Sequence, residues 1–212
     1  MSYLCKEERR AQILQGAIQF FAEVGLSGQT RELSVRLGIT QPLIYRYFSS
    51  KQRLLDAIFE ELFVKRWDPQ WKSLIADASI PLEERIARFY RDFDRKILHR
   101  EWVRLFVFSG LNGFPYNQLV FDRLRRDVFR PLCVELRKRH GYPSTTPGRI
   151  TRQEIEMVWE LHGVVFYHRM RQHVYGLQVR TGIDELITNL LFYLDGAAPR
   201  LLARIFPQVT DR

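Results

Sequence analysis

Cysteine is scarce in this 212-residue chain, which holds only Cys5 and Cys133. Two cysteines without Cys-x-x-Cys or Cys/His spacing indicate neither a disulfide framework nor a metal site. Long apolar runs are lacking too, since no stretch approaches the ~18 apolar residues of a membrane span. The first residues also lack the apolar core and cleavage site of a signal peptide. These absences predict a soluble, cytoplasmic protein with no membrane segment, metal or cofactor.

The motifs of catalysis are also missing. No nucleophile–base set, acid–base pair or phosphate loop can be found, and the segment "SGLNGF" is too short for a nucleotide loop. We therefore expect no enzyme activity and assign no catalytic residue. Positive charge, by contrast, is abundant: the formal net charge is +9 and the pI is near 9.8. Such a balance favours an anionic partner, of which nucleic acid is the commonest.

Helical periodicity runs through the whole chain, with no competing strand alternation, and predicts an all-α fold. The first 66 residues are expected to hold four helices that begin at Ser or Thr caps or end at glycine. They are a helix over 9–24 ended by Gly25, a short helix from Thr30 to Gly38, a third capped by Thr40, and a fourth capped by Ser49 or Ser50.

Longer helices are expected after residue 66, separated by breaks rich in Pro, Gly and Ser. Their predicted ranges are 81–100, 101–109, 117–139, 151–176 and 183–206. Thr151 and Glu154 form a capping box, and Pro199 is expected to kink or restart the last helix. We predict two domains, with residues 1–66 as a helix-turn-helix domain and residues 67–212 as a helical bundle.

The second and third helices have the proportions of a helix-turn-helix, whose second helix enters the major groove of DNA. Gln41, Pro42 and Tyr45 would share one side of the third helix, while Ile44 and Phe48 would face inward. A glutamine amide can bond an adenine edge, and a proline ring can pack on a thymine methyl. Lys51, beside the start of the next helix, suits a phosphate. The segment therefore predicts a DNA-binding surface.

The stretch "FFAEVGLSGQTRELSVRLGITQPLIYRYFSSKQRLL" resembles the DNA-binding domain of the tetracycline-repressor (TetR/AcrR) family of transcription regulators. The resemblance covers about fifty residues without a gap. It implies that Arg31 contacts base or backbone, that Gln41 and Pro42 meet base edges, and that tyrosines and a lysine hold phosphates. The DNA-binding set is Thr30, Arg31, Thr40, Gln41, Pro42, Tyr45, Tyr47 and Lys51. Taken alone, a "YRYF" cluster is more often core than DNA contact.

The last two long helices are the dimer faces that the resemblance implies. A single helix-turn-helix makes few base contacts, and dimers that bind two half-sites are the usual remedy. Both helices carry broad apolar stripes that could equally be core. The candidate dimer residues are Trp159, Gly163, Ile187, Leu191 and Leu194, with Gly163 permitting close helix approach.

The region between these two ends is rich in aromatic residues, which could form either core or an effector pocket. Trp102 and Phe106 lie four residues apart on one helical face, and several arginines between residues 85 and 104 could favour an anionic ligand if one turned inward. The candidate ligand-binding residues are Trp102, Phe106, Asn112, His162 and Phe166. We expect a small hydrophobic effector, neutral or anionic.

The function that these features favour is a ligand-responsive transcriptional regulator. It would bind a palindromic operator on double-stranded DNA as a homodimer, and repression is the default that the resemblance implies. Activation stays open, as do the operator and the effector. The alternative is a helical small-molecule-binding or scaffold protein whose helix-turn-helix is vestigial.

Overall fold

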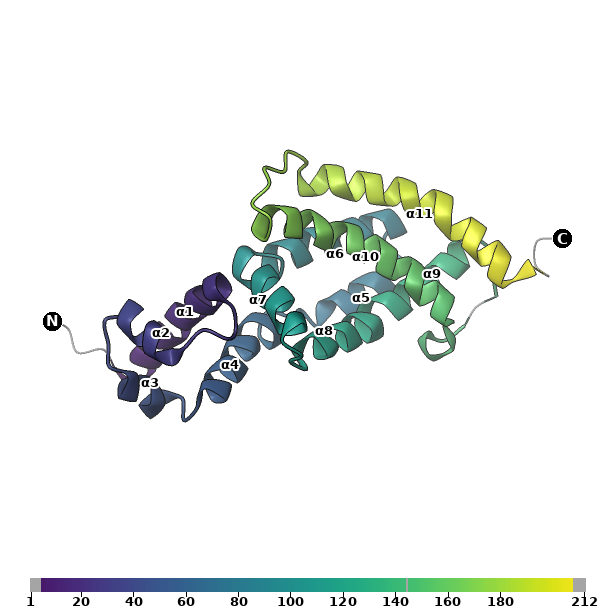
Figure 1. Cartoon of the computed structure of the whole chain (residues 1–212). Helices are drawn as coiled ribbons and strands as arrows, with labels where there is room; N and C mark the ends of the chain where they lie inside the picture. The colour runs from purple at the N-terminus through teal and green to yellow at the C-terminus, as the bar shows by residue number, and fades with distance from the viewer. Residues whose placement is uncertain (1–4, 144, 208–212) are drawn as a thin grey trace. The chain divides into compact units, whose positions relative to one another are not determined.

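The structure, a computed structural model, describes residues 5–143 and 145–207. Over those residues the chain is helical and contains no β-strand (Figure 1). The all-α fold class is therefore confirmed. The α-helices are α1 (Lys6–Val24), α2 (Thr30–Arg36), α3 (Gln41–Tyr47), α4 (Lys51–Phe59), α5 (Gln70–Ala76), α6 (Leu82–Lys96), α7 (Arg100–Leu111), α8 (Tyr116–Leu124), α9 (Arg130–Arg139), α10 (Arg152–His173) and α11 (Ile183–Ile205).

Shorter helical turns extend some of these helices. A π-helical turn, Glu60–Val64, continues α4, a second one, Arg125–Phe129, joins α8 to α9, and a 3₁₀ turn spans Pro147–Arg149. Among the described residues no helix is both long enough and apolar enough to cross a membrane.

Two compact units make up the chain. Unit 1 comprises residues 1–67 and 99–117, and unit 2 comprises residues 68–98 and 118–212. The sequence analysis placed residues 99–117 in its second domain, whereas in the structure α7 packs along α1. The Arg104 guanidinium, for example, donates to the backbone carbonyl of Ala22. The two-domain description by sequence ranges stays a prediction, and the units are used below.

The core of unit 1 is built on α1. Its apolar residues recur at three- and four-residue steps, so they form one buried stripe: Ile13, Leu14, Ala17, Ile18 and Phe21. Gly25 ends the helix with φ of +88°, in the region that favours glycine. Helix α2 contacts both α1 and α3, and the side chains of Leu33 on α2 and Ile44 on α3 are buried.

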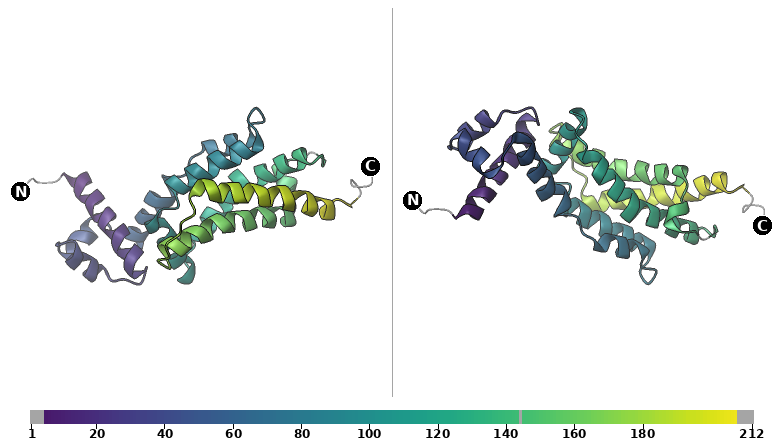
Figure 2. Two further views of the ribbon diagram at one scale, coloured as in Figure 1. Left: turned by 90° about the horizontal axis from the view of Figure 1, so that it is seen from above. Right: turned by 90° about the horizontal axis from the view of Figure 1, so that it is seen from below.

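Unit 2 is a bundle that includes α5, α6, α9, α10 and α11. In Figure 2, α10 and α11 lie side by side in both views, and α11 also contacts α6. Its core encloses two ion pairs. The Arg137 guanidinium donates to both carboxylate oxygens of Glu154, at 2.6 and 2.7 Å, and Arg85 donates to Glu135 at 2.8 Å. Because all four side chains are buried, water does not solvate their charges, and each charge is stabilised mainly by its partner.

Several predicted helix signals are confirmed. Gly25 is the C-cap of α1, the Ser50 hydroxyl accepts from the backbone N–H of Arg53 at 3.1 Å, and Thr151 with Glu154 forms the capping box of α10. The prediction that Thr30 caps the second helix is wrong, because Gln29 is the N-cap of α2 and Thr30 is its first helical residue. Thr40 is the N-cap of α3, although its side chain makes no capping bond.

Two further predictions need correction. Helix α5, Gln70–Ala76, lies outside the predicted ranges, the first of which after residue 66 begins at residue 81. Pro69 is its N-cap, and the helix begins immediately after it. Of the two outcomes expected at Pro199, a restart is wrong, since α11 runs from Ile183 to Ile205 with that proline inside it, and a kink stays a prediction. Proline there removes one backbone hydrogen bond, which a helix of six turns can lose without ending.

Candidate nucleic-acid interface

The turn between α2 and α3 sets the angle of the candidate reading helix. Gly38 has φ of +63°, and the N–H of Ile39 donates to the carbonyl of Ser34 at 3.0 Å. A Cβ at Gly38 would meet nothing within 4 Å, so the backbone conformation, not space, calls for glycine. Pro42 then lies in the first turn of α3, where its missing N–H costs no hydrogen bond.

Helix α3 has one buried side and one exposed side, as its sequence predicts. Ile44 and Phe48 are buried in unit 1. On the other side Pro42 is exposed, and 39% of the Tyr45 side chain is accessible. The exposed side therefore presents the Pro42 ring in the first turn of α3 and the Tyr45 phenol three residues further along.

A chain of hydrogen bonds joins this exposed side to α2. The Gln41 side-chain amide donates from Nε2 to Oγ1 of Thr30 at 2.8 Å, and the hydroxyls of Thr30 and Tyr45 share a bond of 2.8 Å. Thr30 itself is only 5% exposed. Sequence analysis placed Thr30 in the DNA-binding set, and the structure places it behind two residues of that set. No sequence signal pointed to this arrangement, because the partners lie eleven and fifteen residues apart.

Lys51 begins α4 directly after the Ser50 cap. Its ammonium lies 5.6 Å from the centroid of the Phe21 ring. Partial burial lowers the pKa of Lys51, and the nearby Tyr45 opposes that shift less strongly. A phosphate at this ammonium would recover the lost solvation of the charge.

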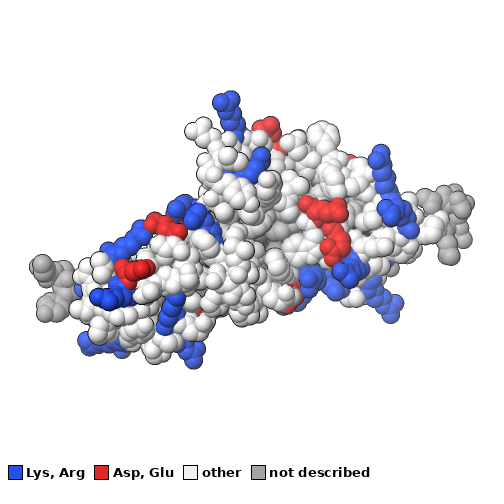
Figure 3. All heavy atoms as spheres, in the orientation of Figure 1, with Lys and Arg blue, Asp and Glu red and all other residues white. Residues whose placement is uncertain are grey.

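The remaining predicted residues also lie near this surface. Arg31 and Thr40 are exposed, while Gln41 and Tyr47 are half-buried. From residue 30 to residue 53 the only acid is Glu32, against five basic residues: Arg31, Arg36, Arg46, Lys51 and Arg53. Figure 3 shows several Lys and Arg side chains, and fewer Asp and Glu side chains, on the visible face of unit 1, at left. An excess of positive charge on this segment favours a polyanion.

One cation near this surface was missed by sequence analysis. The Arg10 guanidinium lies 4.8 Å from the centroid of the Phe48 ring, so a residue of α1 stands at the C-terminal end of α3. Its only sequence signal is the basic pair "RR" in the first helix, which is common on solvated helix faces.

The candidate ligand-binding residues do not form one site in the structure. Trp102 and Phe106 stack on each other at 4.7 Å, beside Phe63, and both are buried in unit 1. Asn112 is at the exposed C-cap of α7, where its amide donates to the carbonyl of Phe108. His162 and the half-buried Phe166 belong to unit 2. Trp102 and Phe106, which were expected to share one helical face, do contact each other, in the core of unit 1, and their role in ligand binding stays a prediction.

His162 is the polar residue inside the aromatic core of unit 2. The rings within 5.3–6.1 Å of its centroid are those of Tyr90, Phe93, Phe129 and Trp159. Burial lowers the pKa of His162 to about 4. Its Nδ1 atom is buried and has no hydrogen-bond partner among the described residues. The imidazole is therefore neutral at pH 7.

The candidate dimer residues divide between core and surface. Ile187 and Leu194 are buried within their own chain, and Trp159 packs edge-on against Phe121 and Phe129. Ile187 and Leu194 therefore lie in the core of unit 2, because the apolar stripe of α11 faces the rest of that unit, and the dimer interface itself stays a prediction. Leu191 is half-buried. Gly163 is exposed, and a Cβ there would meet nothing within 4 Å.

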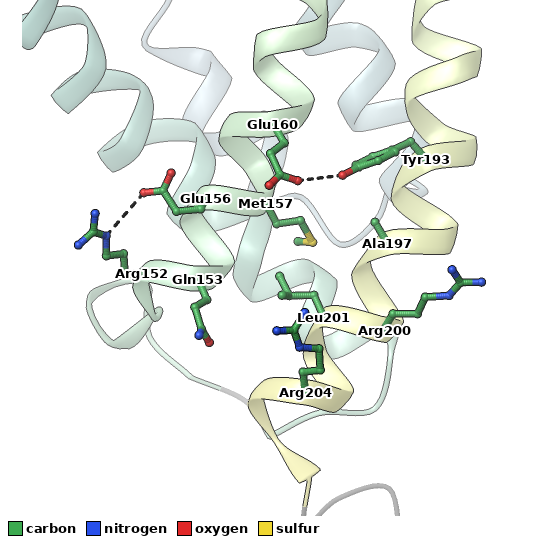
Figure 4. A pocket seen from close by; sticks show the side chains of 10 residues that line it. All are labelled: Arg152, Gln153, Glu156, Met157, Glu160, Tyr193, Ala197, Arg200, Leu201 and Arg204. Carbon is green, nitrogen blue, oxygen red and sulfur yellow. Dashed lines mark hydrogen bonds and ion pairs between the residues drawn. The ribbon is translucent and has the colours of Figure 1, made fainter.

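A different set of apolar side chains covers the outer face of α10 and α11. Val164 and Tyr167 on α10, and Phe192 and Tyr193 on α11, are exposed, with Phe192 at 74%. Figure 4 shows the groove along this helix pair, of about 580 Å³, where the Tyr193 hydroxyl donates to Glu160 at 2.8 Å. Met157 and Leu201 form its apolar floor, while Arg200 and Arg204 line one side.

Known proteins match the N-terminal part of the chain in sequence. Residues 13–58 match the family of bacterial regulatory proteins, tetR family. The tetracycline repressor protein class A of Escherichia coli is 37% identical over 71 residues, which cover 30% of this chain and 33% of that protein. The class D repressor of Escherichia coli is 30% identical over 91 residues, covering 39% and 41%. The matched stretch thus spans only a third to two fifths of these relatives.

Solved structures resemble the chain over nearly its whole length. A TetR-like transcriptional regulator from Rhodococcus sp. RHA1 is 19% identical, with a TM-score of 0.65, and the match covers 92% of this chain and all of that one. A TetR family regulator from Pseudomonas syringae pv. tomato is 16% identical, with a TM-score of 0.55 over 91% and 97%. At these identities the likeness is one of fold.

Proposed function

We propose that the chain, whose residues 13–58 match the tetR family of bacterial regulatory proteins, is a transcriptional regulator that binds operator DNA. The observation that carries the proposal is the two-sided α3. Ile44 and Phe48 anchor it, and Pro42 with Tyr45 stand exposed on the opposite side. Gln41 and Pro42 contact base edges in the major groove, and Tyr45, Tyr47 and Lys51 bind phosphates.

The regulator acts as a homodimer on a palindromic operator. A large exposed apolar patch on a helix pair indicates an interaction surface, and a two-fold dimer uses the same patch on both copies. The outer face of α10 and α11 supplies that patch through Val164, Tyr167 and Phe192. Gly163 on this face lets a second backbone approach closely. DNA binding also assigns the protein to the cytoplasm.

A small hydrophobic effector releases the DNA, which makes the protein a repressor. The aromatic rings around His162 supply apolar contacts, and the neutral imidazole supplies one unused nitrogen. An anionic effector was expected only if one of the arginines between residues 85 and 104 turned inward. Arg85 does so, but Glu135 already pairs with its charge. A neutral effector that donates a hydrogen bond to His162 therefore agrees better with unit 2 than an anion does.

Footprinting of the purified protein on the DNA that flanks its own gene tests operator binding. We expect protection of a two-fold symmetric site and an affinity that falls steeply with salt, as lysine and arginine contacts release counterions. A protein with a vestigial helix-turn-helix would protect no site, and any DNA binding would be independent of sequence. That outcome would favour a helical small-molecule-binding or scaffold protein.

A further inference from the structure

The hydrogen-bonded chain of Gln41, Thr30 and Tyr45 links a candidate base contact to a candidate phosphate contact. Both bonds are 2.8 Å, and they meet at one hydroxyl oxygen of a residue that is 5% exposed. Because Thr30 lies behind its two partners, it acts on DNA through them. This inference rests on the proposed function and concerns what Gln41 can recognise.

The count of hydrogens limits how the three groups can be arranged. A threonine hydroxyl carries one hydrogen, and so does a tyrosine hydroxyl, while a glutamine amide carries two hydrogens on nitrogen and none on oxygen. If Thr30 donates to Tyr45, its oxygen must accept from the Gln41 nitrogen. If Tyr45 donates to Thr30, the Thr30 hydrogen is free to bond the Gln41 oxygen, and the amide can turn over.

A phosphate selects between these two arrangements. Phosphate oxygens only accept, so a Tyr45 that binds a phosphate must give its own hydrogen to it. Tyr45 can then only accept from Thr30, and Thr30 can only accept from Gln41. We propose that Thr30 is a positioning residue whose hydroxyl passes the direction of the Tyr45–phosphate bond to the amide of Gln41.

The fixed amide gives Gln41 one base preference. With one N–H turned to Thr30, the other N–H and the Oε1 oxygen are left for DNA. Adenine offers the matching pair in the major groove, an N6 amino donor and an N7 acceptor. Guanine offers two acceptors, O6 and N7, so the Gln41 oxygen would face an acceptor. The amide in the opposite orientation would tolerate guanine better.

The experiment measures base preference at the operator position that Gln41 contacts, by competition binding with each single-base variant of the footprinted site. That position is the one where Gln41→Ala removes the preference of the wild-type protein. Thr30→Val deletes the hydroxyl and keeps the side-chain shape, and Thr30→Ser keeps the hydroxyl. We expect Thr30→Val to reduce the adenine-over-guanine preference about tenfold and Thr30→Ser to retain it.

Two controls separate this role from a loss of fold. Thr30→Val should leave the dependence of affinity on salt unchanged, because no phosphate contact is removed. In the Gln41→Ala protein, Thr30→Val should change no base preference at all. A purely structural Thr30 would instead weaken binding to every sequence, in both backgrounds.

The outcomes distinguish a failure of the proposed DNA-binding function from a failure of the positioning role of Thr30. A wild-type protein with no preferred DNA sequence would overturn the proposed function and the positioning role together. A wild-type protein with a clear operator whose adenine preference survives Thr30→Val would overturn the positioning role alone. The NMR signals of the Gln41 side-chain amide in the free protein give an independent check, since Thr30→Val should shift them and a substitution at the neighbouring Glu32 should not.

Discussion

Polar side chains are used differently in the α2–α3 pair of unit 1 and in the bundle of unit 2. At α2 and α3 the hydrogen bonds join amide and hydroxyl groups: the half-buried Gln41 and the exposed Tyr45 both bond the buried Thr30 hydroxyl, which leaves donors and acceptors of the outer two for a partner. In unit 2 full charges are buried and paired with each other, as in Arg137 with Glu154. The first arrangement suits recognition, and the second suits a packing that tolerates few alternatives.

The outer face of unit 2 differs from its core, because it leaves apolar side chains exposed that could bind a second copy of the chain. Phe192→Glu should abolish dimers, since a symmetric interface loses two buried aromatic rings, about 3–6 kcal/mol together, and gains two charges. Sedimentation equilibrium measures the change. Leu119→Glu on α8 is the matched control, because Leu119 is also exposed, at 65%, and lies off the proposed face. A dimer that survives Phe192→Glu would exclude this face as the interface.

The next largest effect is expected at the buried ion pair between Arg137 and Glu154. Arg137→Met would leave the Glu154 carboxylate buried with its Thr151 bonds but without a cation. We expect unfolding free energy to fall by about 3–5 kcal/mol, measured by urea denaturation. Lys138→Met serves as control, because Lys138 is half exposed and its pair with Glu135 should contribute under about 1 kcal/mol. Equal losses from both variants would contradict the contrast.

Acid should destabilise unit 2 through His162. Its pKa falls from 6.5 to about 4 on folding, so between these values the unfolded chain binds more protons. Stability should therefore decrease as pH falls from 6.5 towards 4, by at most about 3 kcal/mol from this group. The rings around it belong to Tyr90, Phe93, Phe129 and Trp159, which stay uncharged in that range. Thermal denaturation across this window should show a flatter slope for His162→Gln than for the wild type.

The smallest free-energy change is expected at the DNA-binding surface. Gln41→Ala should reduce discrimination between operator and random DNA by about 1–3 kcal/mol while non-specific affinity stays nearly constant. Lys51→Ala should instead weaken binding to both DNAs alike and reduce the salt slope by about 1. Titrations on both duplexes would contradict the assignment if Gln41→Ala weakened them equally.

The α2–α3 region was predictable because its signals are local. Gly38, Pro42 and Ser50 each act on the backbone within a few residues, and the alternation of Ile44 and Phe48 with exposed side chains follows from helical spacing alone. The hydrogen bonds of Thr30 were not predictable, because they depend on how two helices cross. Helix α5 was missed for another reason: its start is marked only by Pro69, and proline is equally a signal for a break between helices.

In unit 2 the long helices could be predicted from the sequence, but the contacts that their side chains make could not. The apolar period of α11 is real, yet periodicity cannot tell whether Ile187 and Leu194 face their own chain or a second one. The partner of an inward arginine is equally hidden, since Glu135 lies fifty residues from Arg85. Placement of residues 99–117 in unit 1 likewise depends on long-range packing against α1.

Sequence recognition by α3 can be tested directly by a competition titration of the wild-type protein. Its footprinted site competes with a shuffled duplex of equal length and composition, from low to physiological salt. We expect the protein to bind the footprinted site more tightly than the shuffled duplex at every salt concentration, and both affinities to fall steeply as salt rises. Equal affinity for the two duplexes would contradict sequence recognition by α3.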